Sequence, residues 1–179
     1  MSRWACSLAF LALIAVPGCS GGADPTPAPS AHEAAEPAAP PAVRGPRFVK
    51  APDDVPVAEH MAAQVEEASA AGEDILLYVG AHWCEPCQAF HDAVEAGELD
   101  EALPNLRLVE YDLDVDADRL KKADYSSRYI PLFTIPGADG YSSGRQVEGG
   151  IKGDGAVDNI LKRLVPLLET GRTFRKNGG

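Results

Sequence analysis

Hydrophobic and polar positions divide the chain into three regions with different patterns. An uninterrupted apolar run from Leu8 to Val16 follows a short basic start at Arg3. Residues 20–50 are mostly alanine, proline, glycine and serine with scattered charges, and they show no hydrophobic periodicity. From residue 51 onwards, apolar residues recur at the spacings of helices and strands. The pattern therefore predicts a leader, a linker and one folded domain.

The first half of the folded region predicts helices alternating with strands. Apolar side chains recur at helical spacing from Val57 to Ala68, and Gly72 suits the end of that helix. Residues 75–79 form a continuous apolar run, which is typical of a central strand covered on both faces. A second strand is expected at 106–111.

The other expected elements are a helix from the cysteine motif to Gly97, a short helix at 116–124, a strand at 130–135, a turn at 137–140, an antiparallel strand at 145–148 and a helix at 154–168. Alternating units followed by a hairpin predict an α/β fold. We expect a mixed central sheet of about four strands, flanked by helices on both faces. The expected domain spans 51–171 and is followed by a C-terminal tail at 172–179.

Composition and charge narrow the possible functions. The formal net charge of −11 argues against nucleic acid and against electrostatic docking on anionic lipid. Of four cysteines, Cys6 lies in the leader and Cys19 directly follows it. The folded region keeps only Cys84 and Cys87, in a Trp-Cys-Glu-Pro-Cys motif. No cofactor and no metal site are expected, since one such pair supplies only half of a structural zinc site.

The leader, residues 1–18, is typical of a secretory signal and too short for a permanent membrane-spanning helix. Its end, Val16-Pro17-Gly18-Cys19, resembles the processing box of bacterial lipoproteins. The resemblance implies cleavage before Cys19 and acylation of that residue. An ordinary cleavage site followed by a chance cysteine is the alternative. Ser20, where inner-membrane lipoproteins carry aspartate, favours the outer membrane, with the domain facing the periplasm.

The segment at 19–50 is expected to be a disordered tether that begins at the acylated Cys19. It lacks the apolar positions needed to build or join a core. Proline favours extended polyproline conformations of about 3.1 Å per residue, so thirty residues would reach roughly 90 Å. The segment would therefore hold the domain away from the membrane.

The cysteine motif directly follows the predicted central strand and opens the next helix. This placement puts Cys84 at a helix N-terminus, where unpaired N–H groups and the helix dipole favour a thiolate. We therefore expect Cys84 to have a lowered pKa and to be an exposed nucleophile. Cys87 lies one turn deeper, within reach of Cys84. Attack by Cys84 on a substrate disulfide, followed by resolution by Cys87, would complete a dithiol–disulfide cycle.

Two segments resemble the signatures of the thioredoxin fold. One runs from Ala81 to Cys87 directly after a buried strand, and the other is Ile130-Pro131 at the start of a later strand. Gly149-Gly150 resembles a third feature. Within the thioredoxin-like superfamily, the chain is most similar to the periplasmic domains of transmembrane disulfide reductases.

The resemblance implies particular roles for the residues around the two cysteines. It implies a cis peptide bond before Pro131, in a turn that lies against the cysteine pair. It also implies that the backbone of Ile130 pairs with substrate strands. Trp83 would shield the site, and Pro86 would stiffen the first turn of the helix. The residues expected to support the cysteines are Trp83, Glu85, Pro86, Ile130 and Pro131.

Three positions depart from the thioredoxin pattern. Tyr78 stands where the family has a buried aspartate that assists proton transfer. Glu110 stands near the usual lysine, and Gln88 replaces the usual basic residue after the second cysteine. The proton acceptor for the second cysteine stays open among Glu110, Tyr78 and water. Glu85 should raise the pKa of the first cysteine, which favours a reductant over an oxidant.

Two histidines, His82 and His91, flank the motif. They are expected to be surface residues of a loop and a helix. Alternatively, they are pH-sensitive neighbours of the thiols, because histidine titrates near neutrality. His91 follows Cys87 by one helical turn, so it could also join a metal site.

The sequence predicts a membrane-anchored thiol–disulfide oxidoreductase, a protein-disulfide reductase that reduces or isomerises disulfides of exported proteins. Its expected partners are disulfide-containing exported proteins and an upstream thiol electron donor, and the chain is expected to be a monomer. Two alternatives stay open. One is a copper- or zinc-binding module that uses Cys84, Cys87 and a nearby histidine. The other is a redox-inactive binding domain with a thioredoxin fold.

Overall fold

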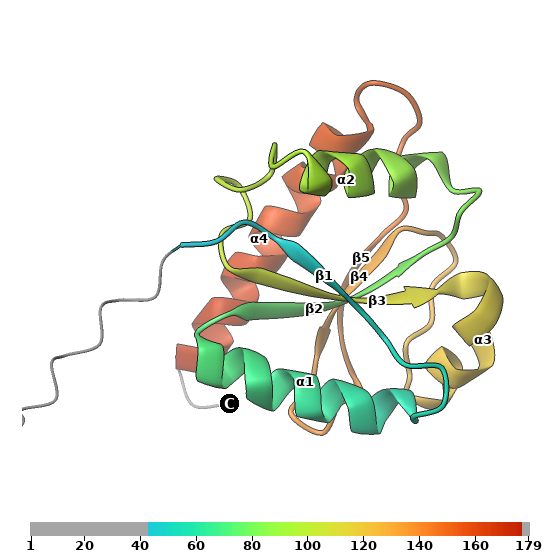
Figure 1. The fold of residues 1–179 in the computed structure, drawn as a ribbon, viewed down its shortest axis with the longest axis vertical. Coiled ribbons are helices and arrows are strands. Elements are labelled where there is room, and N and C mark those ends of the chain that lie inside the picture. Colours follow the sequence, from blue (N-terminus) through green and yellow to red (C-terminus); the bar gives the residue numbers. More distant parts are fainter. Residues whose placement is uncertain (1–42, 177–179) are drawn as a thin grey trace, which may run out of the picture. The chain divides into compact units, whose positions relative to one another are not determined.

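The computed structural model describes residues 43–176, which form a five-stranded mixed sheet with helices on both faces (Figure 1). The strands are β1 (Arg47–Lys50), β2 (Asp74–Gly80), β3 (Leu106–Asp112), β4 (Leu132–Pro136) and β5 (Ser142–Glu148). The helices are α1 (Val57–Ala71), α2 (Glu85–Glu95), α3 (Leu113–Lys122) and α4 (Ala156–Lys176). This architecture confirms the predicted α/β fold.

The strand order in the sheet is β1-β3-β2-β4-β5. Strand β3 pairs in parallel with both β1 and β2, whereas β4 pairs antiparallel with β2 and β5. Every residue of β2 is buried, as its continuous apolar run predicts for a central strand. Register places Tyr78 of β2 opposite Glu110 of β3 on one side and Phe133 of β4 on the other.

The two faces of the sheet carry separate hydrophobic cores. On one face, Phe90 of α2 and Ile160 of α4 pack with Tyr78. On the opposite face, Met61 of α1 and Leu120 of α3 pack with β2 and β3. Figure 1 shows α2 and α1 on opposite sides of the sheet. Both cores consist of side chains that are almost fully buried, so each helix pair is fixed to the sheet by apolar contact.

Local chemistry explains where several elements begin and end. Gly72 ends α1 in the left-handed conformation, with φ of 68°, and its N–H bonds to the carbonyls of Ala68 and Ser69. The side chain of Asp112 caps α3 by accepting a hydrogen bond from the N–H of Asp114 at 2.8 Å. Helix α3 therefore begins at Leu113, three residues before the predicted start.

Two predicted boundaries of the domain are wrong. The strand β1 lies inside the predicted tether at 19–50, and it adds a fifth strand by pairing with β3. It was missed because four residues at the end of a proline-rich segment carry too little pattern to identify a strand. Helix α4 continues to Lys176, beyond the predicted domain end at 171 and into the predicted tail.

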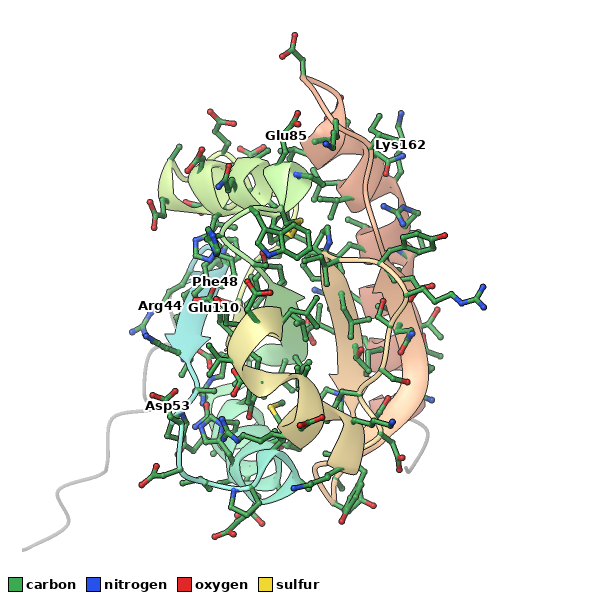
Figure 2. All side chains as sticks on the ribbon, turned by 90° about the vertical axis from the view of Figure 1, so that its right-hand side faces the viewer. Arg44, Phe48, Asp53, Glu85, Glu110 and Lys162 are labelled. Carbon is green, nitrogen blue, oxygen red and sulfur yellow. A yellow bond between two sulfur atoms is a disulfide. The ribbon has the colours of Figure 1, made fainter. Side chains whose placement is uncertain are left out.

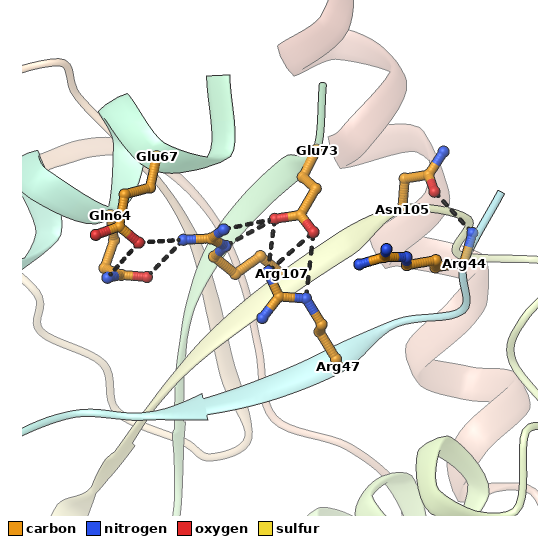
Figure 3. A network of polar contacts seen from close by, with 7 residues as sticks. All are labelled: Arg44, Arg47, Gln64, Glu67, Glu73, Asn105 and Arg107. Carbon is orange, nitrogen blue, oxygen red and sulfur yellow. Dashed lines mark hydrogen bonds and ion pairs between the residues drawn. The ribbon is translucent and has the colours of Figure 1, made fainter. Parts of the chain in front are cut away.

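Arg107 of β3 lies at the centre of a polar network that joins β1, β3 and the end of α1 (Figure 3). It donates to the carboxylates of Glu67 and Glu73 at 2.9 and 2.8 Å and to the side chain of Gln64 at 2.8 Å. Arg47 of β1 also donates to Glu73, at 2.8 Å. The network therefore fixes the edge strand to the rest of the sheet.

Among residues 43–176, no helix has both the length and the apolar character needed to cross a bilayer. The predicted signal, Cys19 and the first part of the predicted tether lie outside the described residues.

Candidate active site

Cys84 and Cys87 lie where the central strand meets a helix, and they form a disulfide with a Cα–Cα distance of 5.2 Å. Cys84 is the N-cap residue of α2, in an extended conformation. Its carbonyl accepts hydrogen bonds from the N–H groups of Cys87 and Gln88, both at 3.0 Å. Pro86 stands in the first turn, where its missing N–H costs no hydrogen bond. The first cysteine thus stands at a helix N-terminus, as the sequence predicts.

Cys84 is more enclosed than the sequence predicts, whereas Cys87 is buried as expected. Cys84 is 5 % exposed and Cys87 is 2 % exposed. Ala81, Leu113 and Ile130 pack against the pair. The expectation of an exposed nucleophile is therefore wrong for the disulfide form, because three elements meet around it. Cys84 nevertheless lines a cavity and is accessible from that side.

The Ile130–Pro131 peptide bond is cis, which confirms the prediction. Ile130 packs on the cysteine pair, so this turn lies against the disulfide. The carbonyl of Pro131 accepts a hydrogen bond from the N–H of Gly149 at 2.8 Å. A side chain at the neighbouring Gly150 would meet Pro86, with a Cβ–Cβ distance of 3.0 Å. The glycine pair therefore lets the loop after β5 approach the cysteine motif closely.

A cavity of about 500 Å³ opens beside Cys84, between the motif, α3 and the loop before β4. Most of the predicted site residues line this cavity. They are Trp83, Cys84, Glu85, Pro86 and Ile130. The structure therefore brings these residues together at one opening.

Trp83 is 57 % exposed and is held in place by α3. Its indole Nε1 donates to Oδ2 of Asp114 at 2.9 Å. The same oxygen lies 3.7 Å from Nδ1 of His82. Asp114 was not selected as a site residue from the sequence. The signal that could have found it is the parallel pairing of β2 and β3, because the motif follows one of these strands and Asp114 follows the other at the same edge of the sheet.

Glu85 points away from the disulfide, toward the loop before α4 (Figure 2). Its Oε1 accepts a hydrogen bond from the N–H of Gly153 at 2.8 Å. Nζ of Lys152 lies 4.0 Å from its Oε2. The cation offsets part of the carboxylate charge, and the Glu85 side chain is half exposed. The electrostatic effect of Glu85 on Cys84 is therefore smaller than the sequence alone suggested.

A second cavity, of about 520 Å³, lies on the Cys87 side of the motif. Tyr78, His91 and Glu110 line it together with Cys87. Burial raises the pKa of Tyr78 well above its ordinary value, and the Glu110 carboxylate raises it further. Tyr78 therefore stays protonated at neutral pH and is a poor proton acceptor. Glu110, the other side chain that the sequence left open as a proton acceptor, lies in the same cavity as Cys87.

His91 forms a close ion pair with Glu110, with 2.6 Å between Nε2 and Oε1. The hydrogen bond that His91 donates to the Glu110 carboxylate raises the pKa of His91 above its ordinary value, although burial acts in the opposite direction. The imidazole also stacks on the ring of Phe48, with centroids 3.7 Å apart. Figure 2 labels Phe48 and Glu110 close together beside α2. His91 is therefore fixed from two sides, although the sequence suggested a surface position.

The predicted metal-binding alternative gains no support from this geometry. Within residues 43–176, no group of three or more histidine, cysteine or acidic side chains is arranged to hold a metal ion. Both ring nitrogens of His91 face carboxylates, since Nδ1 lies 3.9 Å from Glu95. Nε2 of the histidine that could have joined the cysteines is thus hydrogen-bonded to Glu110.

Comparisons with known proteins identify similar sequences and structures. A family model described as thioredoxin-like matches residues 57–137. No curated protein matches the chain significantly. The solved structures that match include a mutant thioredoxin from Halobacterium salinarum, 19 % identical, which covers 70 % of this chain and 89 % of its own with a TM-score of 0.39.

Two plant thioredoxins are also similar to this chain. Poplar thioredoxin h is 21 % identical, covers 70 % of this chain and 97 % of its own, and has a TM-score of 0.42. Oxidised thioredoxin O1 from Arabidopsis thaliana is 20 % identical, with coverages of 69 % and 97 % and a TM-score of 0.41. The family match and the sheet order identify the fold of this chain as thioredoxin-like, and its vicinal cysteine pair indicates thiol–disulfide oxidoreductase chemistry in general.

Proposed function

We propose that this protein reduces or isomerises disulfide bonds of exported proteins through a Cys84/Cys87 dithiol–disulfide cycle. The observation that carries this proposal is the position of the pair. The disulfide stands at the N-terminus of α2, against Ile130 and at the edge of a cavity of about 500 Å³. A substrate disulfide can reach Cys84 from this cavity.

The cycle begins with the reduced protein. The free N–H groups and dipole of α2 favour the Cys84 thiolate, which attacks one sulfur of the substrate disulfide. One substrate thiolate leaves and takes up a proton, and a mixed disulfide joins Cys84 to the other substrate sulfur. Cys87 then loses its proton and attacks the sulfur of Cys84. The second substrate thiol is released, two electrons have passed to the substrate, and the Cys84–Cys87 disulfide is restored.

The side chains around the pair support particular parts of this cycle. The backbone of Ile130 would pair with an extended segment of the substrate, because it borders the cavity beside Cys84. Trp83, held by Asp114, would cover the mixed disulfide. Pro86 fixes the first turn of α2, and Pro131 shapes the turn that carries Ile130.

The direction of electron flow that we propose is reductive. Glu85 places a negative charge one residue after Cys84, which disfavours accumulation of the thiolate. A strong oxidant requires a stabilised thiolate, so this motif suits a reductant. Lys152 offsets part of the negative charge of Glu85 but does not cancel it. A reductant of this kind needs an upstream dithiol donor that reduces the Cys84–Cys87 disulfide after each turnover.

We further propose that lipid on Cys19 anchors the protein in the bacterial envelope, with the outer membrane favoured and the domain facing the periplasm. Several acyl chains would give a durable anchor, since each buried methylene contributes about 0.8 kcal/mol. Replacement of the acceptor, Cys19→Ser, should move the protein from the membrane fraction to the soluble fraction. Membrane retention of this variant would overturn lipid anchoring at Cys19.

The catalytic proposal is tested with reduced protein and a disulfide-bonded protein substrate. Wild-type protein should reduce the substrate, Cys84→Ser should be inactive, and Cys87→Ser should accumulate a mixed disulfide visible on a non-reducing gel. A matched control is Ser143→Ala, a hydroxyl on β5 that bonds to the carbonyl of Ile135, away from the motif. Reduction by Cys84→Ser at the wild-type rate would refute the proposal. An intact substrate and tight retention of copper or zinc would instead favour the metal-binding alternative.

A further inference from the structure

The cycle proposed above requires a group that removes the proton of Cys87 before the mixed disulfide is resolved. The residue is 2 % exposed, so bulk water reaches it poorly except through an adjoining cavity. The cavity of about 520 Å³ that Cys87 lines is large enough for several water molecules, since one water occupies about 30 Å³ in the liquid. A proton can therefore leave Cys87 through water in this cavity.

His91 and Glu110 line the same cavity and form its closest ion pair. His91 follows Cys87 by four residues on α2, so both side chains lie on one face of the helix. Glu110 reaches His91 from β3, and both side chains are about 30 % exposed. The pair is therefore in contact with solvent inside the cavity rather than sealed in the core.

The hydrogen bond between the pair determines which ring nitrogen can accept a proton. An ionised carboxylate has no hydrogen to donate, so Nε2 of His91 carries the hydrogen of its contact with Glu110. In the neutral ring, Nδ1 then carries the lone pair, and it lies 3.9 Å from Oε1 of Glu95, whose charge also favours its protonation. Glu110 stabilises the imidazolium that forms when Nδ1 takes up a proton.

We propose, on the basis of the function proposed above, that His91 oriented by Glu110 accepts the proton of Cys87 through water in this cavity. The Cys87 thiol loses its proton, and Nδ1 of His91 gains one. The resulting Cys87 thiolate attacks the sulfur of Cys84 and releases the substrate thiolate. Glu110 is a positioning residue, because it acts through His91. The imidazolium then returns its proton to solvent.

Other charged groups also surround His91. On α2 itself, Asp92 and Glu95 both follow His91 in sequence, and both favour the imidazolium. From β1, Lys50 stands opposite Glu110 in register and lines the cavity. The remaining titratable groups of the cavity are Asp53, Tyr78, His82, Tyr111, Asp112 and Asp116. Carboxylates outnumber cations among the residues that line this cavity, so the local charge favours the imidazolium form of His91.

The proposal fixes the direction of the pH dependence. Below the pKa of His91, Nδ1 already holds a proton and cannot accept another. As the pH rises through that pKa, the neutral ring becomes available and the resolving step accelerates. Without the His91–Glu110 pair, the rate of the resolving step should instead rise with ionisation of the Cys87 thiol, near the ordinary thiol pKa of about 8.5.

The test uses an aromatic disulfide reagent that releases one coloured thiolate at each of the two steps. The background is the full chain with Cys6→Ser and Cys19→Ser, so that Cys84 and Cys87 are the only thiols. Stopped-flow absorbance then records a first phase for attack by Cys84 and a second phase for attack by Cys87. A further Cys87→Ser exchange should remove only the second phase and so assigns the two phases.

His91→Gln and Glu110→Gln should slow the second phase at pH 7 about tenfold or more and move its pH profile toward that of a free thiol. The first phase should stay within a factor of about two of wild type. Added imidazole should restore the second phase of His91→Ala. His82→Gln is the matched control, because this exposed histidine also borders the motif but lacks a hydrogen-bonded carboxylate. It should behave as the parent chain.

The rates of the two phases in the variants decide whether His91 and Glu110 act on Cys87. A second phase with parental rate and pH profile in both folded variants would overturn the proposal, even if thermal unfolding showed a loss of stability. Equal slowing of the two phases would overturn it too, because the pair would then act on Cys84. Failure of the parent chain to show either phase would refute the proposed function itself.

Discussion

Arg107 and its partners form a cluster of charged side chains where β1, β3 and the end of α1 meet. Arg107 is 7 % exposed and binds three partners, of which the Glu73 side chain is 11 % exposed and that of Glu67 is mostly exposed. A buried ion pair stabilises little beyond an apolar pair of the same volume, but breaking it leaves an uncompensated charge. The contact between Arg107 and Glu73 is therefore the sensitive one.

Replacement Arg107→Met should lower the free energy of unfolding by about 3 kcal/mol, because it leaves Glu73 with Arg47 alone. Chemical denaturation measures the change. The double replacement Arg107→Met and Glu73→Gln should recover part of the loss, since no buried carboxylate then lacks its partner. Arg44→Ala is the control, because this exposed residue contacts Asn105 through its backbone N–H. A loss for Arg44→Ala equal to that of Arg107→Met would contradict this account.

Glu73 should also contribute a pH-dependent part of the stability. Burial alone would raise its pKa, but hydrogen bonds from Arg47 and Arg107 outweigh burial and hold the pKa below its ordinary value of 4.5. A lowered carboxyl pKa stabilises the folded state above pH 4.5, and this stabilisation is lost as the pH falls through the folded-state value. Glu73→Gln should therefore flatten the acid limb of the stability profile. An unchanged acid limb would show that Glu73 does not contribute to it.

At the level of elements, the β4–β5 hairpin depends on how closely its turn approaches α1. Gly140 has φ of 78°, and a Cβ there would lie 1.8 Å from the carbonyl oxygen of Ala58. Gly144 in the same hairpin has a similar φ of 74° but no heavy atom within 4 Å of the corresponding position. The two glycines therefore separate backbone strain from steric overlap.

Gly144→Ala should cost about 1 kcal/mol, from left-handed strain alone. Gly140→Ala should cost about 3 kcal/mol, because overlap with α1 adds to the same strain. Thermal or chemical unfolding of both variants measures the difference. Equal losses would mean that the turn moves away from α1 without penalty.

The edge strand β1 supports the cysteine side of the domain as well as the sheet. Phe48 contacts the rings of Tyr78, Phe90 and His91. A chain that begins at Ala51, the boundary predicted from the sequence, should lose at least about 3 kcal/mol relative to one that begins at Val43. Comparison of the two chains by denaturation tests this. Equal stability would show that β1 is dispensable.

The sequence predicted those parts of the fold and site that depend on local pattern. The apolar run of β2, the glycine that ends α1 and the cysteine motif are each readable within a few residues. The strand β1 was not, because its stability comes from pairing with β3, some sixty residues away in the chain. The pair of His91 and Glu110 was missed for the same reason, since α2 and β3 meet only in the folded state.

At the level of the whole molecule, the described domain carries the chemistry and the N-terminal region would determine its location. The domain has the thioredoxin-like fold, with one cavity on the Cys84 side, where we propose that substrate binds, and one on the Cys87 side, where we propose proton transfer. The net charge of −11 favours neutral or cationic protein partners over nucleic acid. The tether and the exported substrates belong to our proposal for the function.

The equilibrium redox potential of the Cys84–Cys87 couple tests the central claim most directly. It is measured by thiol alkylation in dithiothreitol or glutathione buffers, with Cys6→Ser and Cys19→Ser so that no other thiol reacts. Our account predicts a two-electron transition near the thioredoxin value of roughly −270 mV. A potential near −120 mV would contradict the reductive direction, and the absence of a two-electron transition would contradict the redox function altogether.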